Sequence, residues 1–194
     1  MKYLLSAFLI LMVLTQTAAA DDASGVRETM ETKLNAALGI IEKEELDRQA
    51  KQEKVAEIVG PLFDYALMSY YALGKTNWSG LSSEDKKRFT ELFTQRLKES
   101  YLTKIALYTD EKIVFETPIE EKNKIYIPTY FITQDENMSI VFKFIKRNND
   151  WKIYDVEIEG ISIISSYRSQ FKETLQSGTI EELLTKLEEM ESIQ

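Results

Sequence analysis

The chain of 194 residues carries 24 lysines and arginines against 32 aspartates and glutamates, a net charge of −8, and it contains no cysteine and no histidine. This composition excludes disulfides, thiolate nucleophiles, Cys/His zinc sites, Ser-His-Asp triads and imidazole bases. The excess of negative charge argues against nucleic-acid binding and against passive adsorption to anionic lipid. The length suits one domain, and a hydrophobic content of 44% is enough for a sizeable core.

Residues 1–20 have the three-part pattern of a secretory signal peptide. A basic start at Lys2 precedes an apolar run over residues 3–14, and Ala18 and Ala20 provide an A-x-A cleavage site. The run is about a dozen residues long, which is too short for a transmembrane helix of about 20 residues. We therefore predict cleavage after Ala20, export to a bacterial periplasm, and a single domain over residues 21–194.

Two helical patterns follow the predicted cleavage site. Apolar residues recur at steps of three and four over residues 26–43, and this periodicity resumes over residues 54–59. The charged stretch 42–52 either interrupts the helix or continues it as a solvated face. Gly60 and Pro61 then predict a break, because proline cannot continue a helix.

The next two helices have clear end signals. Residues 62–73 are predicted to form a short apolar helix, and Gly74 is suited to end it because glycine readily adopts a positive φ. Another helix is predicted to begin at Ser82, where Asp85 completes a capping box.

Beyond residue 111 the hydrophobic period changes from that of a helix to that of a strand. Segments 112–117, 124–133, 138–146 and 151–159 are predicted strands, and Pro128 indicates that the second is an edge strand or contains a bulge.

Two helices close the chain. One carries Tyr167 and Phe171 and ends near Gly178, and the other begins with a capping box of Thr179 and Glu182. Helices, then a strand meander, then helices predict an α+β fold, with helices packed on one face of a small, about four-stranded antiparallel sheet.

Side-chain alternation assigns faces to two of the predicted strands. In the third strand, the face expected to point toward the helices consists of Met138, Ile140, Phe142 and Phe144. In the fourth strand, one face is expected to consist of Tyr154, Val156 and Ile158. Composition alone does not separate a solid core of such side chains from an apolar cavity between sheet and helices.

Several carboxylates stand in apolar surroundings. They are Asp64, Asp155 and Glu159. A carboxylic acid in an apolar pocket can serve as an acid or base without histidine. The favoured interpretation is structural, with Asp64 bound to backbone or a base and Asp155 paired with Arg168 or a lysine. A metal site of Asp155, Glu157 and Glu159 is less favoured than the solvated side of a sheet.

The C-terminal half resembles the signature of the MlaC family, also called the toluene-tolerance family. Residues 151–162, with the sequence WKIYDVEIEGIS, and residues 167–171, YRSQF, carry the resemblance. The pairs Phe63-Asp64 and Met68-Ser69 resemble an earlier family stretch, and the similarity extends over about residues 47–187.

The resemblance implies a periplasmic carrier that shuttles one glycerophospholipid between an outer-membrane lipoprotein–porin complex and an inner-membrane ABC transporter complex, maintaining outer-membrane lipid asymmetry. It implies that the acyl chains lie between sheet and helices while the head group remains in solvent. It further implies a monomer without catalytic activity, cofactor or metal, in which phospholipid is the cargo.

The expected lipid-binding residues are large apolar side chains of the predicted helices and strands. They are Phe63, Leu67, Tyr70, Phe89, Phe93, Leu97, Tyr101, Met138, Ile140, Phe142, Phe144, Val156, Ile158, Ile163, Tyr167 and Phe171.

Two alternatives belong to other functional classes. A ketosteroid-isomerase-like enzyme would use Asp155 as the base and Tyr154 or Tyr70 as the oxyanion donor. Consecutive strand residues point to opposite faces, so Tyr154 and Asp155 are not expected to share the cavity, which weakens this alternative. A periplasmic scaffold without a ligand is the second alternative.

Overall fold

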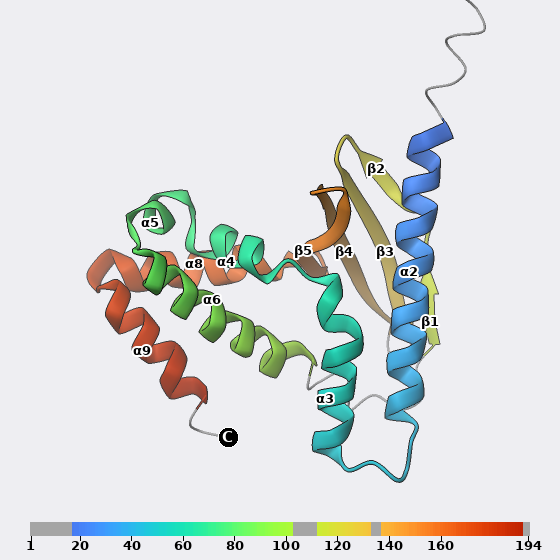
Figure 1. Cartoon of the computed structure of the whole chain (residues 1–194), viewed down its shortest axis with the longest axis horizontal. Coiled ribbons are helices and arrows are strands. Elements are labelled where there is room, and N and C mark those ends of the chain that lie inside the picture. Colours follow the sequence, from blue (N-terminus) through green and yellow to red (C-terminus); the bar gives the residue numbers. More distant parts are fainter. Residues whose placement is uncertain (1–16, 103–111, 133–136, 192–194) are drawn as a thin grey trace, which may run out of the picture.

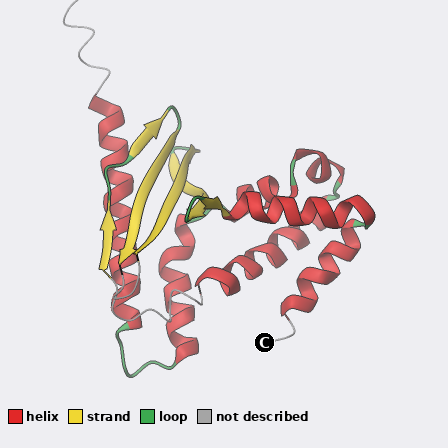
Figure 2. Cartoon of the chain, turned by 180° about the vertical axis from the view of Figure 1, so that it is seen from behind, coloured by secondary structure: helices red, strands yellow, loops and turns green. Residues whose placement is uncertain are grey.

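An antiparallel sheet and two groups of helices make up the part of the chain that this computed structural model describes, residues 17–102, 112–132 and 137–191. Two helices, α2 (Thr17–Ile41) and α3 (Arg48–Val59), run along the sheet (Figure 1). The others form a group beside it (Figure 2): α4 (Tyr65–Leu73), α5 (Lys75–Gly80), α6 (Ser83–Leu97), α8 (Ile163–Ser177) and α9 (Ile180–Glu191). The predicted α+β class is confirmed.

The first helices begin earlier than the apolar periodicity indicates. Residues 1–16 of the expected leader lie outside the described residues, and residues 17–20 form the first turn of α2, so cleavage after Ala20 stays a prediction. Helix α3 begins within the charged stretch, because Asp47 caps it by accepting a hydrogen bond from the Ala50 amide at 2.8 Å. The predicted break is a 3-10 turn, η1 (Gly60–Leu62), with Pro61 in its first turn.

Side-chain caps fix the ends of α4 and α6. Asp64 accepts a hydrogen bond from the Leu67 amide at 2.9 Å, and Gly74 ends α4 at a φ of 82°. Ser82 Oγ accepts from the Asp85 amide at 3.0 Å, which confirms the predicted capping box. Helix α6 continues into a π-helical turn, η2 (Lys98–Leu102).

The sheet has the strand order β1-β3-β4-β5-β6, and β2 also pairs with β3. The predicted strands correspond to β1 (Lys112–Phe115), β3 (Lys124–Ile132), β4 (Asn137–Arg147) and β5 (Asp150–Ile158). Residues 133–136, part of the predicted second strand and the turn after it, lie outside the described residues. The structure adds β2 (Ile119–Glu121) and β6 (Ile161–Ser162), which are too short to show a period.

Strand β3 is internal, so the expectation that Pro128 marks an edge strand is wrong. It lies between β4 and the two short strands β1 and β2. The ladder is irregular opposite Pro128, because residues 116–118 of the neighbouring segment stand opposite only two residues, 127 and 128. The Pro128 carbonyl accepts a hydrogen bond from the Glu116 amide at 2.9 Å, so its backbone faces the gap between β1 and β2. Proline is tolerated here because no ladder bond needs its missing N–H.

Strand β5 contains a bulge that corrects its predicted faces. Phe144 pairs with Ile153 and Lys143 pairs with Asp155, so Tyr154 is an extra residue in the ladder. Tyr154 leaves the face of Val156 and Ile158. On the opposite face its ring lies 5.1 Å from Lys124 Nζ.

The buried face of the sheet joins the two groups of helices into one core. It contains Ile125 and Ile127 of β3 and Ile140, Phe142 and Phe144 of β4, as the alternation in the third predicted strand indicated. No described helix has the length and apolar character needed to cross a membrane.

Candidate functional site

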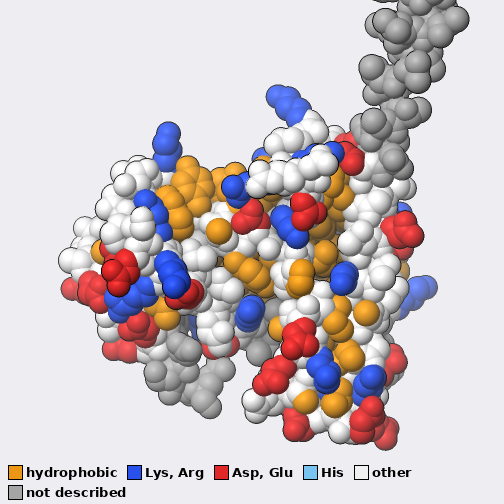
Figure 3. All heavy atoms as spheres, in the orientation of Figure 1, with side chains coloured by type: hydrophobic (Ala, Val, Ile, Leu, Met, Phe, Trp, Pro, Cys, Tyr) orange, Lys and Arg blue, Asp and Glu red, His pale blue; other side chains and the backbone are white. Residues whose placement is uncertain are grey.

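An apolar cavity of about 250 Å³ lies between the buried face of the sheet and the helices. The sheet forms one wall with Phe131 of β3, Met138, Ile140 and Phe142 of β4, and Ile153, Val156 and Ile158 of β5. The bulge in β5 lets Ile153 and Val156 lie on this wall although they are an odd number of residues apart. Hydrophobic side chains also reach the surface between the sheet and the second group of helices (Figure 3).

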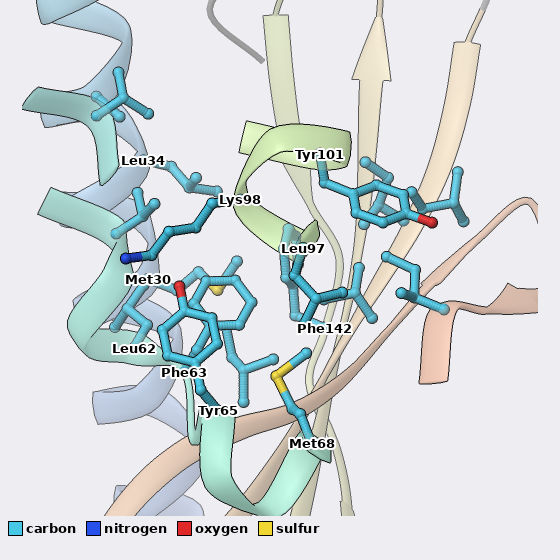
Figure 4. A pocket seen from close by; sticks show the side chains of 18 of the residues that line it. Met30, Leu34, Leu62, Phe63, Tyr65, Met68, Leu97, Lys98, Tyr101 and Phe142 are labelled. Atoms are coloured by element: carbon cyan, nitrogen blue, oxygen red, sulfur yellow. The ribbon is translucent and has the colours of Figure 1, made fainter. Parts of the chain in front are cut away.

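Helices and turns from distant parts of the chain form the other wall (Figure 4). This wall consists of Met30, Leu34 and Ala37 of α2, Val55 and Val59 of α3, Leu62 and Phe63, Tyr65 and Met68 of α4, Leu97 of α6, Lys98 and Tyr101 of η2, and Ile163 of α8. The cavity therefore forms only when α2, α3, the α6–η2 junction and the sheet are all assembled.

Polar atoms are scarce on these walls. Among the described lining residues, side-chain polar atoms belong to Lys98, Tyr65 and Tyr101, and none is a carboxylate. Burial raises the pKa of Tyr65 to about 12 and also raises that of Tyr101, so both phenols remain protonated at neutral pH. The arrangement suits an apolar ligand and provides no acid–base pair.

The structure brings part of the predicted lipid-binding set to the cavity. These residues are Phe63, Leu97, Tyr101, Met138, Ile140, Phe142, Val156, Ile158 and Ile163. Their contact with a lipid stays a prediction, since the structure places them on the wall without a ligand.

The other candidates lie elsewhere, and they are Leu67, Tyr70, Phe89, Phe93, Phe144, Tyr167 and Phe171. Several form an aromatic cluster between α6 and α8. The Phe93 ring centroid is 4.9 Å from that of Tyr167 and 5.4 Å from that of Phe171, in edge-to-face contacts. Phe144 faces the same way as Phe142 but lies beyond the cavity, 2% exposed.

Sequence reasoning left many lining residues out of the candidate set. They are Met30, Leu34, Ala37, Val55, Val59, Leu62, Tyr65, Met68, Lys98, Phe131 and Ile153. The helical periodicity of α2 and α3 marks most of their apolar positions as buried, but it does not show that they face the sheet across a gap. No sequence pattern marked Lys98 as a lining residue, because a lysine next to the apolar stripe of a helix is common.

The two prominent acidic residues have structural partners, as the favoured interpretation held. Asp64 caps α4 and accepts a hydrogen bond from Arg147 at 2.8 Å. Asp155, 6% exposed, accepts from Lys143, so its basic partner is a lysine rather than Arg168. No group of three or more potential metal ligands was found among the described residues.

The isomerase-like constellation is not assembled at the cavity. Asp155, Tyr154 and Tyr70 are absent from its described lining. The bulge places Tyr154 and Asp155 together on the opposite face of the sheet, so the expectation that they point to opposite faces is wrong. The residues that this alternative assigns as base and oxyanion donor therefore do not face the cavity.

Comparisons with known proteins agree with this geometry. The family model described as MlaC protein matches residues 31–189. The intermembrane phospholipid transport system binding protein MlaC of Haemophilus influenzae is 25% identical over 163 residues, covering 75% of this chain and 76% of that protein. The structure of a phospholipid-binding protein from Ralstonia solanacearum, in complex with a phospholipid, matches with a TM-score of 0.73 and 21% identity. It covers 84% of this chain and 94% of that one, and at this identity the likeness establishes the fold alone.

Proposed function

The chain belongs to the MlaC family, and on this premise we propose that it is a phospholipid carrier that holds the acyl chains of its cargo in the cavity between sheet and helices. The observation that carries the proposal is the cavity itself, because its described walls are apolar except for one ammonium and two phenol groups. Such a site suits a ligand with long hydrocarbon chains and gives no basis for catalysis.

The energetics of chain burial explain why a carrier is needed. Each buried methylene contributes about 0.8 kcal/mol, so two acyl chains of about 15 carbons contribute on the order of 20 kcal/mol before the cost of ordering them. Release of such a lipid into water is therefore slow, and transfer must proceed through a docked partner that keeps the chains out of water.

The size of the cavity indicates how loading occurs. Its volume of about 250 Å³ lies below the roughly 300–1,000 Å³ of ordinary small-molecule pockets, and a diacyl lipid is larger than most such ligands. We propose that the sheet and the helices move apart when lipid enters. Met30, Met68 and Met138 suit such a wall, because unbranched thioether side chains repack easily.

The cellular setting forms part of the proposal. We propose that the mature chain, cleaved after Ala20, works in the periplasm as a monomer between an outer-membrane lipoprotein–porin complex and an inner-membrane ABC transporter complex, and so helps to maintain outer-membrane lipid asymmetry. The signal-peptide pattern and the name of the Haemophilus relative, an intermembrane phospholipid transport protein, support it.

Native mass spectrometry of the exported protein, purified without detergent, tests the carrier function. The expected result is a mass increase that matches about one diacyl phospholipid, which is then identified after extraction. Lipid-free protein that also takes up no lipid from phospholipid vesicles in the presence of its partner complexes would overturn the proposal.

A further inference from the structure

One charged side chain stands on an otherwise uncharged wall. Among the described residues that line the cavity, Lys98 is the only one with a charge. It opens the π-helical turn η2, where the chain leaves α6, and π-helical turns of this kind are often found at functional sites. In Figure 4 its side chain extends from η2 toward the Tyr65 ring on the facing wall.

The ammonium group is held in place without an opposite charge. Lys98 Nζ lies 5.7 Å from the centroid of the Tyr65 ring, a cation–π arrangement. No carboxylate of the described residues forms an ion pair with Lys98. Lys98 and Tyr65 are both half-buried, so both side chains keep some contact with solvent.

The cargo of the proposed carrier has one part that the apolar wall cannot accept. A lipid phosphate carries a negative charge, and an ionised group buried without a partner is strongly unfavourable. The acyl chains can lie against the apolar walls of the cavity, while the phosphate must stay where water or a cation reaches it. Lys98 is half-buried and combines an apolar stem with the one ammonium group on the described part of the wall.

We propose that Lys98 Nζ binds the phosphate of the bound lipid and that the cavity thereby selects phosphate-bearing diacyl lipids over neutral diacylglycerol. The inference rests on the proposed carrier function and adds to it the chemistry of the head-group end. Lysine recognises phosphate as a point charge rather than through a fixed fork of donors. Selection therefore acts on the phosphate and not on the alcohol attached beyond it. Tyr65 positions the ammonium through its ring.

Short-chain lipids that dissolve as monomers provide the test. Lipid-free full-length mature protein is titrated with dihexanoyl phosphatidylglycerol, dihexanoyl phosphatidylcholine and dihexanoylglycerol, and binding is measured by calorimetry. Lys98→Met keeps the apolar stem and removes the charge, and Lys98→Arg keeps the charge. Lys172→Met, at an exposed position of α8 that is not part of the cavity wall, is the matched control.

The expected result is that Lys98→Met weakens binding of both phosphate-bearing lipids about tenfold, as loss of one charge-assisted contact predicts, and leaves binding of dihexanoylglycerol unchanged. Lys98→Arg and Lys172→Met should bind like the unaltered protein, and added salt should weaken only the phosphate-bearing lipids. If the Met variant is poorly folded, Lys98→Gln takes its place.

Three outcomes would overturn the inference. They are unchanged phosphate-lipid binding in Lys98→Met, an equal loss for all three lipids, and a loss that Lys98→Arg shares. Failure of the unaltered protein to bind any of the three lipids contradicts the carrier function itself, which separates the two proposals.

Discussion

Lys143 Nζ lies 3.2 Å from Asp155 Oδ2, on the face of the sheet that points away from the cavity. The same oxygen accepts a hydrogen bond from Ser162 Oγ at 2.8 Å, and Asp155 Oδ1 accepts from the Ile164 amide at 3.2 Å. One buried carboxylate thus connects β4, β5 and the first turn of α8. Its role is to hold the sheet and the second group of helices together, beside the cavity but not in it.

Replacing this carboxylate should affect stability more than lipid transfer. Asp155→Asn removes the charge that Lys143 faces, and we expect a loss of about 2 kcal/mol in the free energy of unfolding, measured by urea denaturation. Asp150→Asn is the control, because Asp150 is exposed and its pair with Lys152 should contribute less than about 1 kcal/mol. An unchanged melting temperature together with lost transfer would contradict the structural role.

A charge placed on the cavity wall should empty the protein without unfolding it. In Phe142→Arg the guanidinium enters a space that water can fill when lipid is absent, so we expect a folded protein that carries no lipid. Phe93→Arg is the matched control, because Phe93 is 0% exposed within the aromatic cluster and an unpaired charge there should prevent folding.

Melting curves and bound lipid are measured together for these two arginine variants. If Phe142→Arg does not fold, Phe142 belongs to a solid core. If Phe142→Arg folds and still carries lipid, the acyl chains bind on a face of the sheet other than that of Phe142.

Stability should decline at alkaline pH in a way that depends on Tyr65. Burial raises the pKa of this phenol from 10.0 to about 12, so the unfolded chain releases the proton at lower pH than the folded protein does. The contribution of the protonated Tyr65 phenol to the free energy of unfolding is therefore complete below pH 10 and is lost between about pH 10 and 12.

Tyr65→Phe should make the alkaline decline of the unfolding free energy shallower, and Tyr130→Phe, at a 40% exposed position, should change it little. The same alkaline slope in both variants would rule out this role for Tyr65. The chain has no histidine, so stability should vary little between about pH 5 and 8.

The cap of α4 offers a test that separates hydrogen bonding from charge. Asp64→Ala should cost about 1–2 kcal/mol of unfolding free energy, since both the Leu67 amide and Arg147 lose their partner. Asp64→Asn keeps a good N-cap and loses only the charge opposite Arg147, which is exposed, so its cost should stay below about 1 kcal/mol. If the two variants unfold at the same denaturant concentration, the cap contributes little to stability.

Local signals in the sequence predicted the elements well. The capping box at Ser82, the stop at Gly74 and the strand alternation around Phe142 each depend on a few neighbouring residues, and the structure confirms them. The bulge at Tyr154 and the internal position of Pro128 depend on how strands pair, and pairing is set by residues far away in the chain.

The cavity was less predictable than the fold. Phe93 and Phe142 are both large, apolar and periodic, yet one packs against other rings and the other borders a gap. The difference arises from the separation of whole elements rather than from the residues themselves. For the same reason Met30 and Leu34, in a helix with an ordinary amphipathic pattern, were not expected on the wall.

Because β5 contains an extra residue, its tolerance of deletions should differ between the bulge and the rest of the strand. Removing Tyr154 would leave Ile153 and Asp155 opposite their present partners, Phe144 and Lys143, and would turn a bulged ladder into a regular one. Removing Glu157 instead would shift Ile158 by one position, out of the cavity wall and onto the face of Lys143 and Asp155. Insertions and deletions in this strand are therefore expected to be accommodated at the bulge and excluded beyond it.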